Sequence, residues 1–256
     1  MELNLKDKVI IVTGGAKGIG EGIVKMLVEE GAIPVIVGRN QEDNEKTLAA
    51  IKGKGLAVTA ELTDPEQSKV AVDATIKAYG RIEGLVNNAG INDGINLEHG
   101  NYELFMRSLH RNLVHYYMMA HHALPELIRS KGSIVNISSK TGETGQGGTS
   151  AYAAANGGRN GLTREWAVEL LKYGIRVNAV VVAESYTPLY EKWIKTVADP
   201  EGTLKKITER IPLGQRMTTT EELAAMVVFL LSERSSHTTG QLIHVDGGYV
   251  HLDRAI

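Results

Sequence analysis

The sequence contains no cysteine. This absence excludes disulfide bonds, thiolate metal sites and a cysteine nucleophile, and it is compatible with a reducing cytosol. An excess of one charge is also missing, because 28 Lys and Arg face 30 Asp and Glu, for a formal net charge of -2. The balance offers no electrostatic basis for binding nucleic acid or an acidic membrane surface.

Long hydrophobic runs are absent as well. Apolar runs such as residues 9–12 and 179–183 are far shorter than the ~20 residues that span a bilayer. Residues 1–8 lack the charged and then apolar order of a signal peptide. We therefore expect a soluble cytoplasmic protein. No repeat, low-complexity segment or linker divides residues 1–256, and their length fits one large α/β domain.

Short β-branched apolar runs alternate along the chain with longer stretches of helical period. Continuous apolar runs are typical of parallel strands covered on both faces. The alternation predicts a single-domain Rossmann fold, an α/β doubly wound parallel sheet of about seven strands. The predicted strands are residues 8–13, 33–37, 56–61, 82–86, 133–138, 175–182 and 241–245, and the predicted helices are residues 20–30, 42–52, 65–79, 102–130, 150–173 and 220–232. Residues 188–212 break this alternation with a polar segment, so we expect a substrate lid there.

A glycine-rich segment, residues 13–20 (TGGAKGIG), follows the first predicted strand and opens a predicted helix. Glycines let the backbone turn sharply beside a pyrophosphate, while a helix N-terminus supplies N–H donors and a positive dipole end. This context, more than the glycines alone, predicts a dinucleotide site. A tight turn with packing glycines is the alternative. The expected binding residues here are Gly14, Lys17, Gly18, Ile19 and Gly20.

The end of the second predicted strand bears on the choice of cofactor. An acidic residue there binds the ribose 2′-hydroxyl of NAD, whereas a cation suits the 2′-phosphate of NADP. This chain has Arg39 between Gly38 and Asn40 and no acid, and Lys17 adds a second cation. NADP is therefore favoured over NAD. The alternative is that Arg39 is solvated and stacks on the adenine ring.

These motifs together resemble the short-chain dehydrogenase/reductase family nearly from end to end. Residues 13–20 are similar to its TGxxxGxG motif, residues 87–90 to its NNAG motif, and residues 177–180 (VNAV) and 245–248 (VDGG) to its later landmarks. The resemblance implies a nicotinamide cofactor. It also implies further cofactor-binding residues, namely Glu61, Leu62, Asn88, Ala89, Gly90, Asn156 and Thr187.

Several segments are more closely similar to bacterial L-fucose dehydrogenases of this family. They are residues 87–95 (NNAGINDGI), 111–117 (RNLVHYY), 138–147 (SSKTGETGQG), 162–168 (LTREWAV) and 251–256 (HLDRAI). The resemblance implies NAD(P)-dependent oxidation of a sugar hydroxyl, that of L-fucose or a related aldose, by hydride transfer. Near-identical scaffolds nevertheless serve different substrates.

The resemblance assigns the catalytic positions residue by residue. It gives Tyr152 the role of acid and base, gives Ser139 the substrate oxygen, and places Asn112 at the family's helix asparagine. The family's YxxxK motif departs here, because Asn156 stands where the lysine is expected. An amide donates a hydrogen bond to a ribose hydroxyl but brings no charge. A nearby cation favours a phenolate, so this departure predicts slow catalysis or a raised pH optimum.

Two cations are candidates to replace the lysine. Lys140 directly follows Ser139, and Arg159 lies on the same helical face as Asn156. The alternatives are that both are ordinary surface or interface charges, or that Asn156 is an engineered substitution.

The missing lysine also supports another function, a cofactor-binding pseudoenzyme or sensor with low turnover. A carbonyl reductase is a third possibility.

The loops expected to surround the substrate are polar. A sugar needs several polar partners, because burying an unmatched hydroxyl costs free energy. Asn, Asp and Thr also often cap loops, which is the alternative for any one of them. The expected substrate residues are Asn92, Asp93, Lys140, Gln146, Glu184, Tyr190 and Trp193.

The histidines of the predicted helix 102–130 lack a coherent ligand spacing, so we expect no metal site. They are His110, His115, His121 and His122. In the family, this helix and the one over residues 150–173 form a dimer interface, so the resemblance implies a homotetramer or homodimer. The expected partner is a small-molecule sugar, with no nucleic acid and no membrane.

Overall fold

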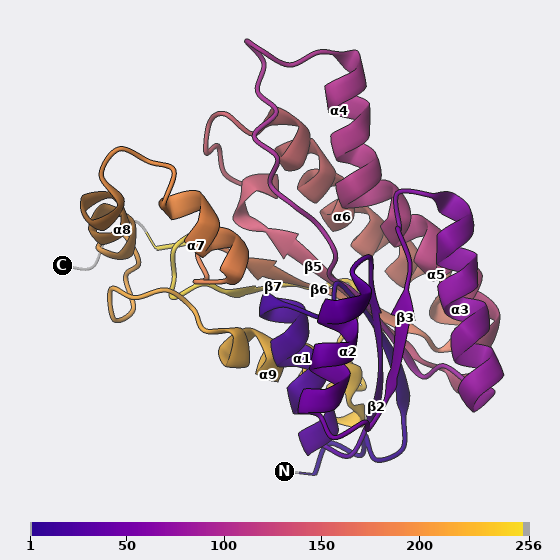
Figure 1. The fold of residues 1–256 in the computed structure, drawn as a ribbon. Helices are drawn as coiled ribbons and strands as arrows, with labels where there is room; N and C mark the ends of the chain where they lie inside the picture. The colour runs from indigo at the N-terminus through magenta and orange to yellow at the C-terminus, as the bar shows by residue number, and fades with distance from the viewer. Residues whose placement is uncertain (1, 253–256) are drawn as a thin grey trace.

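The computed structural model describes residues 2–252, and a parallel sheet of seven strands forms its centre (Figure 1). The strand order is β3-β2-β1-β4-β5-β6-β7, so the direction of winding reverses between β1 and β4. A ligand-binding crevice opens at the carboxyl ends of the strands where such a reversal occurs. The predicted doubly wound Rossmann fold is confirmed. The strands are β1 (Val9–Thr13), β2 (Ile33–Gly38), β3 (Leu56–Thr59), β4 (Gly84–Asn87), β5 (Ser133–Ser139), β6 (Arg176–Val182) and β7 (Leu242–Val245).

Helices cover both faces of the sheet, because alternate strand residues point to opposite sides. In β1, Val9 and Ile11 join one apolar core and Ile10 and Val12 join the other. Burying each such side chain stabilises the fold by about 1.5–3 kcal/mol. The first core packs under α3 (Pro65–Tyr79), α5 (His115–Ser130) and α6 (Ser150–Glu169), and the second under α1 (Gly18–Glu29), α2 (Gln41–Ala50) and α9 (Thr220–Leu231).

The predicted helix over residues 102–130 has the predicted extent, but it is not uniform. It is divided into α4 (Tyr102–Leu109), a π-helical turn η1 (His110–Val114) and α5. Asn112 lies in that turn with its side chain fully buried, donating to the Ser108 carbonyl at 3.0 Å and accepting from the Ile91 N–H at 2.8 Å. A polar side chain that enters the helical ladder in this way favours an extra residue in the turn, and such π-bulges are frequent at functional sites.

Other boundaries differ by a few residues. The strand predicted to end at residue 61 ends at Thr59, and residues 171–173 form a separate 3-10 turn, η3 (Leu171–Tyr173). The segment 188–212 carries two short helices, α7 (Pro188–Ile194) and α8 (Pro200–Thr208), which project from one side of the molecule (Figure 1). No helix in residues 2–252 has the length and apolar character needed to cross a membrane.

Candidate active site

The glycine segment between β1 and α1 forms a backbone cradle. Gly14 and Gly18 have left-handed φ values of 65° and 56°, which favour glycine. A Cβ on Gly20 would lie 2.1 Å from the Gly14 carbonyl oxygen, so only glycine permits this approach. The Lys17 side chain does not cap α1, which leaves the N–H groups of the first turn for an anion. The cradle fits a pyrophosphate.

Asn88 ties this cradle to the end of β4. Its side-chain amide donates to the carbonyls of Thr13 at 2.9 Å and Gly14 at 3.3 Å. The Thr13 hydroxyl in turn accepts the N–H groups of Asn88 and Ala89 at 2.9 and 3.1 Å. These bonds hold the two switch-point strands together, so Asn88 fixes the shape of the loop.

A cleft of about 510 Å³ runs along the carboxyl ends of the strands and opens onto this loop. Most of the predicted cofactor residues and the Ser139–Tyr152 pair line it. These lining residues are Gly14, Lys17, Gly18, Ile19, Arg39, Asn88, Ala89, Gly90, Asn92, Ser139, Tyr152, Thr187 and Tyr190. Glu61 and Leu62 line a smaller adjoining hollow of about 210 Å³.

The remaining predicted residues line neither hollow. They are Gly20, Asp93, Asn112, Lys140, Gln146, Asn156, Glu184 and Trp193. Asp93 instead accepts a hydrogen bond from the Ser108 hydroxyl at 2.8 Å. The predicted lid contributes Pro188, Leu189, Tyr190 and Lys192 to the cleft. Whether it closes over a substrate stays a prediction.

The two cations predicted to select NADP each have an acidic neighbour. Lys17 Nζ lies 2.5 Å from an Asp43 carboxylate oxygen, and Arg39 Nη1 lies 3.9 Å from that of Glu61. Both cationic side chains are more than half exposed. Their charges are therefore screened by water and by a carboxylate, and the expected phosphate site is less strongly positive than the sequence alone indicates.

Ser139 and Tyr152 reach the cleft from different elements. Ser139 ends β5, and its hydroxyl oxygen accepts hydrogen bonds from the Thr141 N–H at 3.3 Å and the Thr141 hydroxyl at 3.2 Å. Its own O–H is then directed to another acceptor. Tyr152 lies in the first turn of α6, and its hydroxyl has no hydrogen-bond partner within residues 2–252. Both residues line the same cleft.

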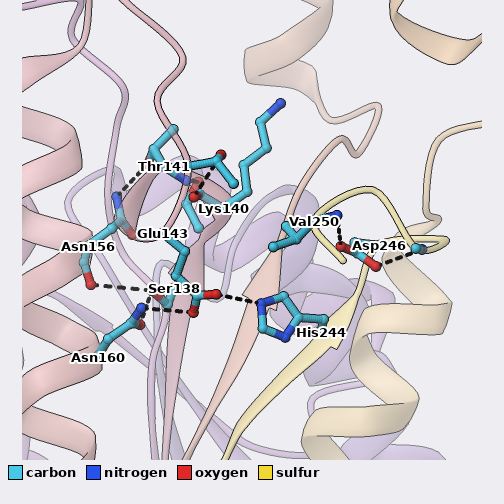
Figure 2. Close-up of polar contacts among 12 residues, drawn as sticks. Ser138, Lys140, Thr141, Glu143, Asn156, Asn160, His244, Asp246 and Val250 are labelled. Atoms are coloured by element: carbon cyan, nitrogen blue, oxygen red, sulfur yellow. Dashed lines mark hydrogen bonds and ion pairs between the residues drawn. The ribbon is translucent and has the colours of Figure 1, made fainter. Parts of the chain in front are cut away.

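Asn156 is fully buried behind Tyr152 and does not line the cleft. Its side-chain nitrogen donates to the Tyr152 carbonyl at 2.8 Å and the Thr141 hydroxyl at 3.4 Å, and its oxygen accepts from Arg159 at 2.9 Å. Figure 2 shows Asn156 beside Thr141 and Ser138, with the Lys140 side chain pointing away from it. The predicted contact of Asn156 with a ribose hydroxyl therefore needs the side chain to turn.

Lys140 and Glu184 form an ion pair with each other. Their side chains are 7% and 12% exposed, and Lys140 Nζ also lies 4.1 Å from the centre of the Tyr249 ring. Of the alternative that Lys140 and Arg159 are ordinary surface or interface charges, the surface part is wrong, because both residues are buried. A buried pair of this kind is costly to break, since either partner would be left as an uncompensated charge.

His115 and Tyr116, at the start of α5, lie behind the cleft. Burial, and then the nearby Arg159 charge, lower the pKa of His115 to about 3. Burial raises the pKa of Tyr116 above its ordinary value, and its hydroxyl donates to the Ile137 carbonyl at 2.9 Å. At neutral pH the imidazole is therefore uncharged and the Tyr116 phenol keeps its proton.

One group of ligand-type side chains lies apart from the cleft. Glu143, His244 and His251 bring their ligand atoms within 4.8 Å of one another. Glu143 already accepts hydrogen bonds from Asn160 at 3.2 Å and His244 at 3.0 Å, as Figure 2 shows. The carboxylate is thus satisfied without an ion. Within residues 2–252 the helix histidines form no such group.

Some cleft residues had no signal in the sequence. Val182, Ser185 and Lys192 line it, and Tyr249 packs on Lys140 from a loop far away in sequence. Arg159 also lines the cleft. It was a candidate because it lies seven residues after Tyr152 on the helical face of Asn156, but helical spacing does not show whether a side chain is buried. Residues 253–256 of the segment similar to L-fucose dehydrogenases lie outside the described residues.

Comparisons with known proteins show relatives that match nearly the whole chain. The family described as Enoyl-(Acyl carrier protein) reductase matches residues 14–250. The chain is 38% identical to the Thermotoga maritima 3-oxoacyl-[acyl-carrier-protein] reductase FabG, covering 97% of this chain and all of that protein. It is 36% identical to the Bos taurus L-fucose dehydrogenase, covering 94% of this chain and 88% of that one.

Solved structures are similar over nearly their whole length. The Cj0485 dehydrogenase is 48% identical with a TM-score of 0.95, covering all of this chain and 99% of that one. The aldohexose dehydrogenase AldT of Thermoplasma acidophilum is 32% identical with a TM-score of 0.90 and the same coverage. The glycine cradle, the Ser139–Tyr152 pair and these similarities together show that this chain belongs to the short-chain dehydrogenase/reductase family of oxidoreductases.

Proposed function

We propose that the protein is an NAD(P)-dependent dehydrogenase that oxidises a sugar hydroxyl, that of L-fucose or a related aldose. The observation that carries this proposal is the meeting of Ser139 and Tyr152 with the glycine cradle in one cleft. Family members bind NAD(P), and one structural relative, an actinorhodin polyketide ketoreductase, contains NADPH. We favour NADP because Arg39 and Lys17 line the adenosine end of the cleft.

Ser139 and Tyr152 have different roles in the oxidation. The Ser139 hydroxyl donates a hydrogen bond to the substrate oxygen and fixes its position. The Tyr152 phenolate accepts the proton of the substrate hydroxyl, and the substrate C–O single bond becomes a carbonyl as the hydride leaves the same carbon. A bound NAD(P)⁺ supplies the two-electron acceptor for that hydride. Oxidation of an anomeric hydroxyl gives a lactone.

The cradle would hold the cofactor through its backbone. The N–H groups at the start of α1 suit the pyrophosphate, and Thr187, the N-cap of α7, lines the cleft and would contact the nicotinamide as the family resemblance implies. Because Asn88 braces the loop, the phosphate position is set before binding. A preorganised site loses less entropy when its ligand binds.

Polar groups at the cleft support a sugar as substrate. Asn92, Ser185 and Tyr190 belong to its lining, although the Ser185 and Tyr190 hydroxyls are buried, and Lys140 and Glu184 form a buried ion pair that does not line it. A long acyl chain would need an apolar channel instead. The relatives named L-fucose dehydrogenase and aldohexose dehydrogenase support the same substrate class.

The test follows cofactor reduction with NAD and NADP across a range of pH, using L-fucose, D-arabinose, L-galactose and a non-sugar alcohol. We expect turnover with at least one sugar and its loss in Tyr152→Phe, by about 10²–10⁴-fold. A Tyr117→Phe variant, changed on the exposed face of α5, serves as the matched control. Turnover that survives in Tyr152→Phe contradicts the assigned role.

The similarity to FabG favours a second candidate, a reductase of a carbonyl substrate. A 3-oxoacyl thioester with reduced cofactor is therefore a parallel substrate. Faster reduction of the thioester than oxidation of any sugar replaces the sugar proposal with this one. Cofactor binding without turnover in either direction leaves a binding protein, the pseudoenzyme alternative.

A further inference from the structure

Arg159 is a buried cation that lines the cleft together with Tyr152; only 3% of the residue is exposed. Its Nε donates to the Asn112 carbonyl at 2.6 Å, and its Nη1 donates to the Ile137 carbonyl at 3.2 Å. Further bonds reach the side-chain oxygens of Asn156 at 2.9 Å and Asn112 at 3.4 Å. A guanidinium has five N–H donors. One on Nη2 therefore has no partner within residues 2–252.

The charge of this guanidinium is not neutralised by the described part of the chain. All its acceptors are uncharged oxygens, and no carboxylate in residues 2–252 lies within 4.0 Å of it. A buried charge without a counter-ion costs free energy. Because this one borders a cleft, it offers an attractive position to an anion there.

The other titratable groups around Tyr152 contribute no net charge. On α5, His115 is neutral and Tyr116 keeps its proton. Lys140, on the turn packed against α6, is paired with Glu184. Arg159 is the unpaired charge among these groups, with its Cζ 5.9 Å from the centre of the Tyr152 ring. Lys192 of α7 also lines the cleft, but within residues 2–252 it makes no cation–π contact with that ring.

We propose that Arg159, and not Lys140, is the cation that stabilises the phenolate of Tyr152, acting as a positioning residue for proton transfer. The inference rests on the proposed function, in which Tyr152 accepts the proton of the substrate. The substrate proton moves to the Tyr152 oxygen, and Arg159 keeps all of its own protons throughout.

Asn156 and Gly90 hold this cation in place. The Asn156 oxygen accepts from Arg159 Nη1 while its nitrogen is bound to the backbone of Tyr152, so one amide connects the two residues. A Cβ on Gly90 would lie 2.9 Å from Nη2, so a larger residue there would displace the guanidinium from its present position. A lysine at position 156 would place a second cation against the first.

The experiment compares Arg159→Gln and Arg159→Lys with the unaltered protein, each with a Tyr152→Phe partner for subtraction. Ultraviolet difference absorption of the phenolate is titrated against pH, which needs neither cofactor nor substrate. The pH profile of kcat/KM is measured in parallel. Arg176→Lys is the matched control, because Arg176 is another largely buried arginine bound to neutral oxygens at the end of α9, and it does not line the cleft.

We expect Arg159→Gln to move the Tyr152-dependent titration upward by about 1–3 pH units. Arg159→Lys and Arg176→Lys should keep it within about one unit, since the charge near Tyr152 is retained. The kcat/KM profile of Arg159→Gln should shift by the same amount. Asn156→Lys should lower the stability of the fold, because it places a second buried cation beside Arg159. Asn156→Lys combined with Arg159→Gln should return the titration to that of the unaltered protein.

An unchanged titration in folded Arg159→Gln overturns the proposal. If Arg159→Gln does not fold, the variant that combines Asn156→Lys with Arg159→Gln is the test. A Tyr152 titration at the pH of the unaltered protein supports a requirement for one cation, and a titration at higher pH contradicts it. A Lys140→Gln variant that alone shifts the titration assigns the role to Lys140 instead. Absence of turnover in every protein, with the titration shift present, rejects the proposed function and keeps this inference.

Discussion

At the scale of the residue, Arg39 is the side chain on which cofactor choice depends most directly. It lies at the end of β2, lines the cleft and is mostly exposed, with Glu61 3.9 Å away. We expect Arg39→Ala to lower kcat/KM for NADP about tenfold relative to NAD, because a charge-assisted bond to the 2′-phosphate is lost. Arg81→Ala, which removes an arginine outside the cleft, should leave the ratio unchanged. An equal ratio in both variants contradicts the preference for NADP.

His115 makes stability depend on pH. Its folded-state pKa of about 3 lies below the ordinary 6.5, so the unfolded chain binds the proton more tightly. The stabilising contribution is complete above about pH 6.5 and is lost as the pH falls, at about 1.4 kcal/mol per unit. Urea unfolding between pH 7 and pH 4 should show a steeper loss in the unaltered protein than in His115→Gln, by about this amount.

An exposed histidine supplies the comparison for this measurement. His99, whose side chain is 76% exposed, should be replaceable by glutamine without change in the slope. Identical slopes for His115→Gln and the unaltered protein would mean that His115 takes up a proton in the folded state near its ordinary pKa.

At the scale of the element, the loop between β1 and α1 depends on backbone geometry. A methyl group on Gly20 would meet the Gly14 carbonyl at 2.1 Å and the Asn88 amide at 2.7 Å. We expect Gly20→Ala to lower dinucleotide affinity by at least about tenfold, because the cradle must open. Nicotinamide fluorescence on binding measures this. Gly161→Ala, where nothing lies within 4 Å of the new Cβ, should bind as before, and equal affinities would refute the role of the cradle.

The long predicted helix shows what periodicity leaves out. Residues 102–130 have a continuous helical pattern, and propensity alone gives no reason for a break. The π-helical turn arises because Asn112 is buried against Ile91 and Ser108, and only the packed chain brings these groups together. The same turn presents the Asn112 carbonyl to Arg159.

At the scale of the whole molecule, apolar side chains remain exposed on the outer face of α5, α6 and η3. Tyr117, Val168 and Leu171 are 50%, 69% and 59% exposed. Exposed apolar groups favour an interface, and because the family resemblance implies an oligomer, we propose that a second copy of the chain covers these residues. Val168→Glu should reduce the mass measured by light scattering, whereas Leu213→Glu, which is 72% exposed elsewhere, should not. An unaltered protein that is monomeric contradicts the proposal.

The sequence alone predicted the Rossmann sheet, the glycine cradle and the Ser139–Tyr152 pair. Each depends on local order: apolar runs separated by helical stretches, glycines between a strand and a helix, and motif spacing within one strand–helix unit. The ends of strands were predicted less accurately, as at the end of β3, because the position where a strand ends depends on its partner strand. Only some of the predicted substrate residues line the cleft, since loop side chains such as Asp93 and Glu184 bind other protein groups.

The sequence by itself thus determined the architecture, and the resemblance of its motifs to the family indicated the proposed reacting groups, because both depend on residues close together in the chain. Only the tertiary structure decided which cation faces Tyr152. Lys140 and Arg159 were equal candidates in the sequence, but Lys140 is paired with Glu184, which lies after a different strand, while Arg159 has only neutral acceptors. Charge compensation between distant segments depends on burial and distance in space, and neither is determined by spacing along the chain.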